Sequence, residues 1–466
     1  MQALVPPSES SDAYPNSIQG TTTSRNVPIR EWIMEDIKLR RRDVLKGVIA
    51  GSALATTPLR TIAAPAVLKG TPKGEIVVWN FRGNNADDIW QYPFYTEFAQ
   101  QTGYKVNVQN RPWDSQRTDI LAALAGGRVP DLFKGHSKYV GEFGANGVLQ
   151  ALDEIDGWAE YSSQFIPAYV DQLKYKGKQY GAPYSTGAFV LAGNKSLMEA
   201  AGVASPTTWS ELKASAAKAT NTGKGVYGIV LPGGANQDSA YRWCAWLYKA
   251  GGRVLDDEWT KPIFNSEAGV ATLALWVDLK KAGSLPPGVP AYGYNDEAQF
   301  FGLGKAVFAS EGNWWQRAME DGYKFPSSNL VLSPLPAADG VKGVAPAETL
   351  SDLNMFGMFK DGPNTAGAWE LMKFARSTKA DLALATTGGE AIPVTKAAYE
   401  PGVNWRLYGK DIFLKEAPAS VLWPSHPNIT EIQVILGEAI NAALTGSMTP
   451  KEALDAAAAK TADVIG

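Results

Sequence analysis

The chain of 466 residues is long enough for two or three domains of ordinary size, and its formal net charge is −3. Hydrophobic residues make up 45% of it and charged residues 20%, the balance of a soluble globular protein. The single cysteine, Cys244, excludes an internal disulfide framework, and the two histidines argue against a histidine-rich metal site. The near-neutral charge shows no basic footprint for a nucleic acid. We therefore expect no metal, no cofactor and no nucleic-acid partner.

The N-terminal part of the chain is predicted to lie outside the folded protein. Residues 1–30 are rich in Ser, Thr, Pro and Asn and lack periodicity, which is typical of disorder. A basic stretch at 40–46, a short apolar stretch at 47–55 and small residues at 63–66 follow in the order of a secretory signal. The apolar stretch is too short and too glycine-rich to span a membrane. We predict a disordered or mis-assigned leader over 1–39 and a signal peptide over 40–66.

Two further interpretations concern this signal. The pattern Arg41-Arg42-x-Val44-Leu45-Lys46 resembles the twin-arginine export signal of bacteria, which implies a periplasmic protein and the twin-arginine export machinery as a partner. A basic amphipathic tail is the alternative reading of the same residues.

Strands and helices are predicted to alternate in the first part of the mature chain. The expected elements are a strand over 75–79, a helix around Trp90, Phe94 and Phe98, a strand over 105–108, a helix around Ile120, Leu121 and Leu124, and a strand over 130–133. This alternation predicts a parallel sheet covered by helices. Ligands of such sheets bind beyond the carboxyl ends of the strands, which are here residues 80–85 and 134–138.

Residues 180–195 are interpreted as a crossing between two lobes. The stretch is strand-like but contains Pro183 and Gly187, which mark an edge, a bulge or a bend. Similar alternations of strands and helices precede and follow it. We therefore predict that it leaves one lobe and enters a second, with Tyr184 and Ser185 at the crossing. An ordinary edge strand fits the same residues locally.

The second part of the chain repeats the strand–helix alternation. The expected elements are a helix starting within 206–212, a strand over 227–231, a helix over 241–249, a helix through Val270, Leu273 and Val277, and a strand over 306–310 that opens into a loop at 311–315. A strand within 350–360 and a helix around Ala368 and Met372 then return to the first lobe. A helix with a stripe from Ile432 to Ile440 and a capping box at Thr449-Pro450-Lys451-Glu452 close the chain.

Several short motifs occur together in a fixed order. They are Pro130-Asp131-Leu132-Phe133, the Gly-x-Pro-Tyr crossing that ends in Asn194-Lys195, Pro206-x-Thr208-Trp209-x-Glu211-Leu212, Ala250-Gly251-Gly252, Gly304-Lys305-Ala306, Gly312-Asn313-Trp314 and Gly446-x-x-Thr449-Pro450-x-Glu452-Ala453-Leu454. In this order and spacing they resemble the extracellular solute-binding proteins of bacterial ABC importers, the family that includes the maltose-binding protein. The resemblance covers nearly all of residues 74–466.

This resemblance implies an α/β, two-lobed periplasmic-binding-protein fold. Each lobe is then a mostly parallel sheet flanked by helices, and crossing hinge strands join them. The N-terminal lobe would comprise 74–183 and 338–400, and the C-terminal lobe 186–335 and 404–466. The implied function is that of a monomeric, exported, non-enzymatic binding protein. It would capture a small solute, a sugar or oligosaccharide, in the cleft between the lobes and deliver it to an ABC import permease.

A sugar site needs flat aromatic faces that stack on the ring and polar side chains that pair with hydroxyls. The resemblance implies stacking by Trp314 and a ligand-facing ring at Tyr241, whereas Trp243 fits the core equally well. The family often places a tryptophan near Lys134 or Gly135 and an aspartate near Ser137, and their absence argues against maltose-type specificity. Ser239 stands where some members carry an acidic ligand residue, so that contact is not implied here. The full set of candidates is Trp79, Arg82, His136, Ser137, Tyr184, Asn236, Gln237, Tyr241, Trp243, Glu311, Trp314 and Asp352.

Two other classes of function stay open at this point. A secreted glycoside hydrolase would need two carboxylates about 5–10 Å apart, for which Glu311 and Asp352 are available. A serine hydrolase would need a Gly-x-Ser-x-Gly elbow, which the chain lacks. A binding protein for a non-sugar solute such as a polyamine would need more acidic residues in the cleft than the sequence places there.

Overall fold

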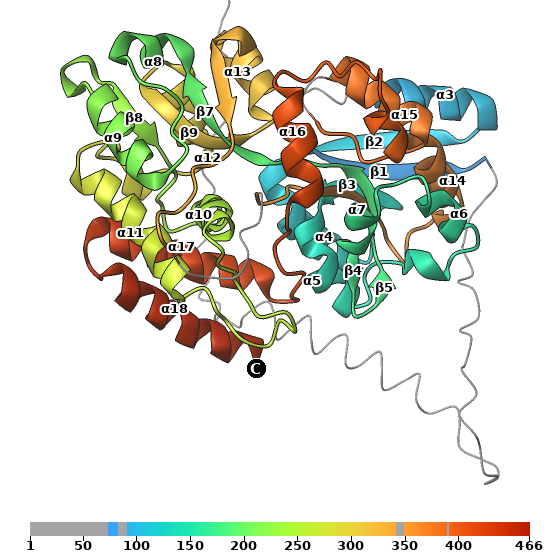
Figure 1. Cartoon of the computed structure of the whole chain (residues 1–466). Helices are drawn as coiled ribbons and strands as arrows, with labels where there is room; N and C mark the ends of the chain where they lie inside the picture. The colour runs from blue at the N-terminus through green and yellow to red at the C-terminus, as the bar shows by residue number, and fades with distance from the viewer. Residues whose placement is uncertain (1–72, 83–90, 342–348, 389–390) are drawn as a thin grey trace, which may run out of the picture. The chain divides into compact units, whose positions relative to one another are not determined.

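The computed structural model describes residues 73–82, 91–341, 349–388 and 391–466, all of which belong to one compact unit spanning 62–466 (Figure 1). The predicted leader, the signal peptide and Trp90 lie outside these residues. None of the helices described is long and apolar enough to cross a membrane.

The first sheet has five strands in the order β2-β1-β3-β11-β6. Its strands are β1 (Glu75–Arg82), β2 (Lys105–Pro112), β3 (Leu132–His136), β6 (Ala182–Ser185) and β11 (Asn354–Met358). Strand β1 runs parallel to β2 and β3, whereas β11 is antiparallel to both β3 and β6. We call this sheet and the helices packed on it the N-lobe. The helices are α3 (Tyr92–Thr102), α4 (Gln116–Ala125), α5 (Val140–Ala145), α6 (Trp158–Ser162), α7 (Pro167–Asp171), α14 (Thr365–Ala375) and α15 (Thr378–Ala383).

The second sheet has four strands in the order β10-β7-β9-β8. Its strands are β7 (Phe189–Asn194), β8 (Tyr227–Val230), β9 (Ala306–Gly312) and β10 (Leu330–Ser333). We call this sheet and its helices the C-lobe. The helices are α8 (Lys195–Ala201), α9 (Trp209–Ala219), α10 (Gln237–Lys249), α11 (Glu267–Lys281), α12 (Tyr294–Gly302), α13 (Trp315–Tyr323), α17 (Ile429–Thr445) and α18 (Pro450–Ile465). Outside the two sheets lie a hairpin of β4 (Lys174–Tyr175) and β5 (Lys178–Gln179), and helix α16 (Lys410–Glu416).

The two-lobed α/β fold is confirmed, but the sheets are mixed rather than mostly parallel. Pairs β7–β9 and β7–β10 are antiparallel, and only β8–β9 is parallel in the C-lobe. The reason lies in the connections between lobes. Every antiparallel pair of the two sheets contains one of the strands β6, β7, β10 and β11, which carry the chain from one sheet to the other. A strand that enters a sheet from the opposite lobe runs against the strands of the local βαβ units.

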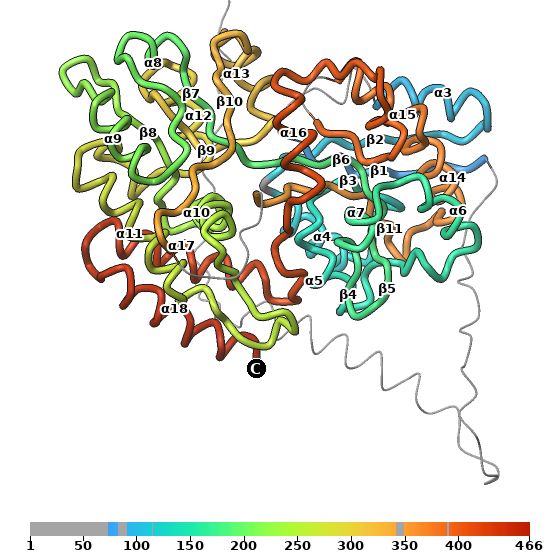
Figure 2. The backbone as a smooth tube through the Cα atoms, viewed as in Figure 1, coloured from blue at the N-terminus to red at the C-terminus, as the bar shows by residue number. Residues whose placement is uncertain are grey.

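The stretch 180–195 does cross from one sheet to the other, as Figure 2 shows. Strand β6 pairs with β11 in the N-lobe, and β7 pairs with β9 in the C-lobe. Between them, backbone bonds tie the crossing to two other segments. The Gly187 N–H donates to Asp352 O at 3.0 Å, and the Thr186 N–H donates to Ile392 O at 2.9 Å. Tyr184 is buried and lies edge-on against Phe356, with ring centroids 4.9 Å apart.

Helix starts follow the local sequence closely. The Thr208 hydroxyl accepts the Glu211 N–H and so caps α9, and Thr449 and Glu452 form the predicted capping box of α18. Such caps typically contribute about 1 kcal/mol each. Strand ends were predicted less well. Strands β1 and β3 extend to Arg82 and His136, so most of the residues expected beyond the strands are paired within them.

Candidate functional site

Three side chains from distant parts of the chain meet where the lobes adjoin. His136 ends β3 of the N-lobe, Tyr241 lies on α10 of the C-lobe, and Asp352 lies in the crossing segment before β11. His136 Nε2 is 3.0 Å from the Tyr241 hydroxyl and 2.8 Å from Asp352 Oδ1. The Tyr241 hydroxyl also lies 3.0 Å from Asp352 Oδ1, to which it can donate. All three are sequence-predicted candidates, and the fold brings them into one hydrogen-bonded trio.

Local structure fixes the imidazole of His136. Its Nδ1 accepts the backbone N–H of Lys138 at 2.9 Å, so this nitrogen carries no proton. Its own backbone N–H donates to Gln116 Oε1 on α4 at 2.8 Å. The remaining nitrogen, Nε2, must therefore carry the proton of the neutral ring, and it points at the Asp352 carboxylate.

The protonation states of the trio follow from burial and from the partners. Burial lowers the pKa of His136, against the opposing effect of the Asp352 charge. Burial would raise the pKa of Asp352, but His136 and the Tyr241 hydroxyl outweigh it, so that pKa is lowered. Burial also raises the pKa of Tyr241. Near neutral pH the trio is a neutral imidazole and a neutral phenol that share one carboxylate.

Further contacts join the lobes beside the trio. Lys138 Nζ donates to Gln237 Oε1 at 3.2 Å, and the Thr430 hydroxyl lies 3.4 Å from Glu142 Oε2. Gln237 lies one helical turn before Tyr241 on α10, so both side chains share a face of that helix. Ser137 is buried next to these contacts, and its hydroxyl oxygen has no hydrogen-bond partner among the described residues.

Aromatic rings surround the trio. Tyr241 stacks on Trp423 with centroids 5.8 Å apart and an interplanar angle of 8°. The ring of Trp113 lies 6.1 Å from that of His136. Neither tryptophan was among the candidates from the sequence: Trp113 directly follows β2, which extends to Pro112 and thus past its predicted end at 108, and Trp423 lies outside the predicted elements. The only signal was their position in short segments next to proline.

Trp314 is half-buried and lies edge-on to Phe189, 5.2 Å away. It is the residue before α13 rather than part of an open loop. Glycine is required beneath it, because a Cβ at Gly187 would be 2.6 Å from its ring and one at Gly312 would be 2.2 Å away. The ring therefore covers the crossing strand directly, close to the Gly187–Asp352 backbone bonds.

The other candidates lie in different surroundings. Trp79 is buried in the N-lobe core, with the Arg111 guanidinium 3.6 Å from its ring centre, and Trp243 is fully buried in the C-lobe core. Asn236 caps α10 by accepting the Ser239 N–H at 3.0 Å. Tyr184 packs in the N-lobe core, and Arg82 is half-buried at the end of β1. Their packing and capping roles are visible here, and ligand contact by these residues stays a prediction.

Glu311 belongs to a second buried network. Arg242 Nε donates to Glu311 Oε1 at 2.9 Å and lies 3.5 Å from Glu297 Oε2. Burial raises the pKa of both carboxyl groups, and it does so most strongly at Glu297, which also faces the charge of Glu311. The two carboxylates considered for a hydrolase, Glu311 and Asp352, are thus each engaged by different partners.

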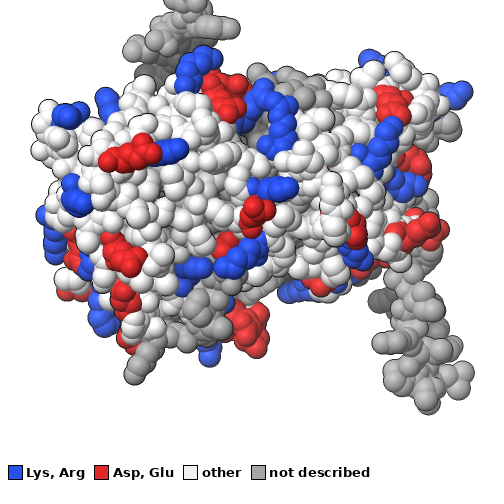
Figure 3. Space-filling view, turned by 45° about the horizontal axis from the view of Figure 1, so that its top comes forward, with Lys and Arg blue, Asp and Glu red and all other residues white. Residues whose placement is uncertain are grey.

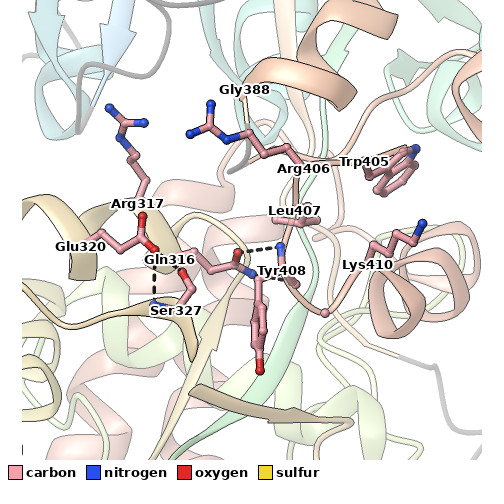
Figure 4. Close-up of a pocket in the computed structure, with 11 residues that line it drawn as sticks. Gln316, Arg317, Glu320, Ser327, Gly388, Trp405, Arg406, Leu407, Tyr408 and Lys410 are labelled. Atoms are coloured by element: carbon pink, nitrogen blue, oxygen red, sulfur yellow. Dashed lines mark hydrogen bonds between the residues drawn. The ribbon is translucent and has the colours of Figure 1, made fainter. Parts of the chain in front are cut away.

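A hollow of about 510 Å³ is lined by α13 and by residues 405–410 (Figure 4). Two of its lining residues, Gln316 and Tyr408, are hydrogen-bonded to each other. Gln316 Nε2 donates to Tyr408 O at 2.8 Å, and the Tyr408 N–H donates to Gln316 Oε1 at 3.0 Å. None of the sequence-predicted site residues lines it.

The chain is similar to known binding proteins. The family model described as bacterial extracellular solute-binding protein matches residues 94–409. A binding protein of Brucella abortus (strain 2308) is 26% identical over 374 residues, which cover 79% of this chain and 87% of that protein. The mannitol-binding protein of Pseudomonas aeruginosa is 27% identical over 362 residues, or 69% of this chain and 77% of that protein.

Solved structures share the same fold. The ABC transporter solute-binding protein of Thermotoga lettingae, bound with α-D-tagatose, superposes with a TM-score of 0.72 at 24% identity. The superposition covers 84% of this chain and all of that one (100%).

Proposed function

Because the chain belongs to the bacterial extracellular solute-binding proteins, we propose that it captures a sugar or sugar alcohol between its lobes for an ABC import permease. The observation that carries this proposal is the trio His136–Asp352–Tyr241, which links the N-lobe, the crossing segment and the C-lobe within 3.0 Å. A ligand that binds at this junction contacts both lobes at once, and so it favours their closure.

The chemistry around the junction suits a polyhydroxy solute. Trp314 and Trp113 offer flat rings, and Ser137 offers a buried hydroxyl without a protein partner. The carboxylate of Asp352 can accept hydroxyl protons of a ligand. A relative that binds mannitol supports the same class of solute. We assign ligand contact to these residues and to His136 and Tyr241.

We also propose that the protein binds without turnover, works as a monomer and is periplasmic after twin-arginine export. The lobe boundaries at 74–183 with 338–400, and at 186–335 with 404–466, belong to this proposal. Replacing Arg41 and Arg42 by lysine should hold the protein in the cytoplasm. Normal export of that variant would contradict the twin-arginine route.

A thermal-shift screen of sugars, sugar alcohols and polyamines tests the proposed ligand class. A ligand that binds only the folded protein, at 100 times its Kd, adds about 2.7 kcal/mol to the free energy of unfolding. We expect stabilisation by at least one sugar or polyol, and no product when oligosaccharides are incubated with the protein. Stabilisation by polyamines alone would contradict the ligand class, and release of shorter sugars would favour a hydrolase.

A further inference from the structure

One side of the lobe junction is closed by direct contact between the lobes. Along the N-lobe segment 136–142, three side chains meet partners on α10 and α17: His136 with Tyr241 at 3.0 Å, Lys138 with Gln237 at 3.2 Å, and Glu142 with Thr430 at 3.4 Å. We call this row of contacts the seam. It begins at the trio and runs away from it along η2 (Ser137–Tyr139) and α5.

The backbones also touch along the seam. A Cβ built on Gly141 of α5 would be 1.7 Å from the carbonyl oxygen of Ser425, which lies in the segment leading into α17. Contact this close leaves no room for even one layer of ligand atoms between α5 and that segment. The seam therefore bounds the proposed binding site on one side, and a ligand cannot lie within it.

The carboxylates at the seam are hydrogen-bonded within the protein. Glu142 Oε1 accepts a hydrogen bond from Arg117 Nε at 2.8 Å, and the Asp352 carboxylate is bonded to His136 and Tyr241. An anionic ligand would place a like charge beside the Asp352 carboxylate, which is costly in a buried site.

From the seam we infer that this site takes one small unit, a single sugar ring or an open-chain polyol, and not an oligosaccharide. This inference rests on the proposed function. A longer chain that extends from the trio along η2 and α5 would meet the seam, which begins at the trio. To bind, it would have to break the three cross-lobe contacts and part the backbones at Gly141.

Titration calorimetry with four probes tests the inference: D-mannitol, D-glucose, maltose and maltotriose. We expect the tighter of the two single-unit probes to bind at least tenfold more tightly than either oligosaccharide. In a Lys138→Ala/Thr430→Ala double variant, which removes two contacts of the seam, this ratio should fall at least threefold. The matched control is Lys174→Ala, an exposed lysine paired with Asp171 at 2.6 Å, and it should leave the ratio unchanged.

The outcomes separate the inference from the proposed function. Maltotriose binding as tightly as the single-unit probes would overturn the inference and leave the proposed function standing. An unchanged ratio in the folded double variant would also overturn it, because the seam would then set no length limit. If none of the four probes binds, the inference falls, whereas the proposed function falls only if the thermal-shift screen also finds no sugar or polyol that stabilises the protein.

Discussion

Ligand affinity should depend on pH through His136. In the closed structure its Nδ1 accepts the Lys138 N–H, so a proton added there would face a hydrogen-bond donor. The titratable groups facing the ring are Asp352, Tyr241 and Lys138. Burial is the largest cause of its lowered pKa, and the Lys138 charge adds to it, against the raising effect of Asp352. Opening the lobes removes Tyr241 and admits water, which returns the pKa toward its ordinary value of about 6.5.

The sign and the size of the effect follow by linkage. A group whose pKa is lower in the closed state releases a proton on closure, so closure is favoured above both pKa values and weakens as the pH falls below about 6.5. One proton changes the closure equilibrium by at most tenfold per pH unit. Between pH 7.5 and 5.5 we therefore expect the Kd to rise about tenfold. Asp352, whose pKa is lowered, stays ionised throughout this window and does not contribute.

Calorimetry at pH 7.5, 6.5 and 5.5 and at constant ionic strength measures this change with the best ligand of the screen. His136→Gln keeps a neutral polar side chain and should flatten the profile. The chain has one other histidine, His426, which is half-buried and bonded through Nδ1 to the Asn428 N–H at 3.0 Å. Burial also lowers the pKa of His426, so His426→Gln measures any second contribution and should retain the part of the profile that is due to His136. An equal pH dependence in His136→Gln and the native protein would refute the reasoning.

Three further predictions concern single side chains. Trp314→Ala should weaken ligand binding roughly 30-fold or more, as measured by calorimetry. In urea unfolding it should lower the free energy of unfolding by less than the about 3–5 kcal/mol expected for a fully buried tryptophan. Native affinity in the folded variant would contradict this prediction. Arg242→Met should lower the free energy of unfolding by about 3–5 kcal/mol at pH 7. The loss should shrink at pH 5, because the raised pKa of Glu311 lets it take up a proton, whereas an equal loss at both pH values would argue against the buried ion pair. Gly141→Ala should keep the lobes apart, so that saturating ligand no longer lowers the radius of gyration in small-angle scattering as it does for the native protein.

The sequence predicted most elements because local rules decide them. The apolar run at the start of β1, the hydroxyl cap at Thr208 and the capping box at Thr449 each act within a few residues. The ends of strands depend on partners elsewhere in the chain. Strand β3 continues to His136 because β11, more than 200 residues later, pairs with it there. No local pattern contains that information.

The candidate site shows the same division between local and long-range information. His136 was named from its position after a strand, Tyr241 from the family resemblance and Asp352 as a polar candidate, but their mutual contact depends on the strand order. The antiparallel register places Asn354 opposite both His136 and Ser185, and this sets Asp352 against Gly187 at the crossing. Stacking of Trp423 on Tyr241 depends on packing between α10 and the segment before α17.

Glycines on both sides of the junction connect the fold with its proposed action. At Gly187 and Gly312 the missing side chains let Trp314 lie directly on the crossing strand, and at Gly141 a missing side chain lets the two backbones meet. None of these three glycines has a positive φ, so their role is close approach and not a turn. The closure proposed above needs this close approach at Gly141, where a single added methyl group would hold the two backbones apart. Few relative positions of the two lobes therefore allow these contacts, which suits a binding protein whose ligand-bound and ligand-free states must differ.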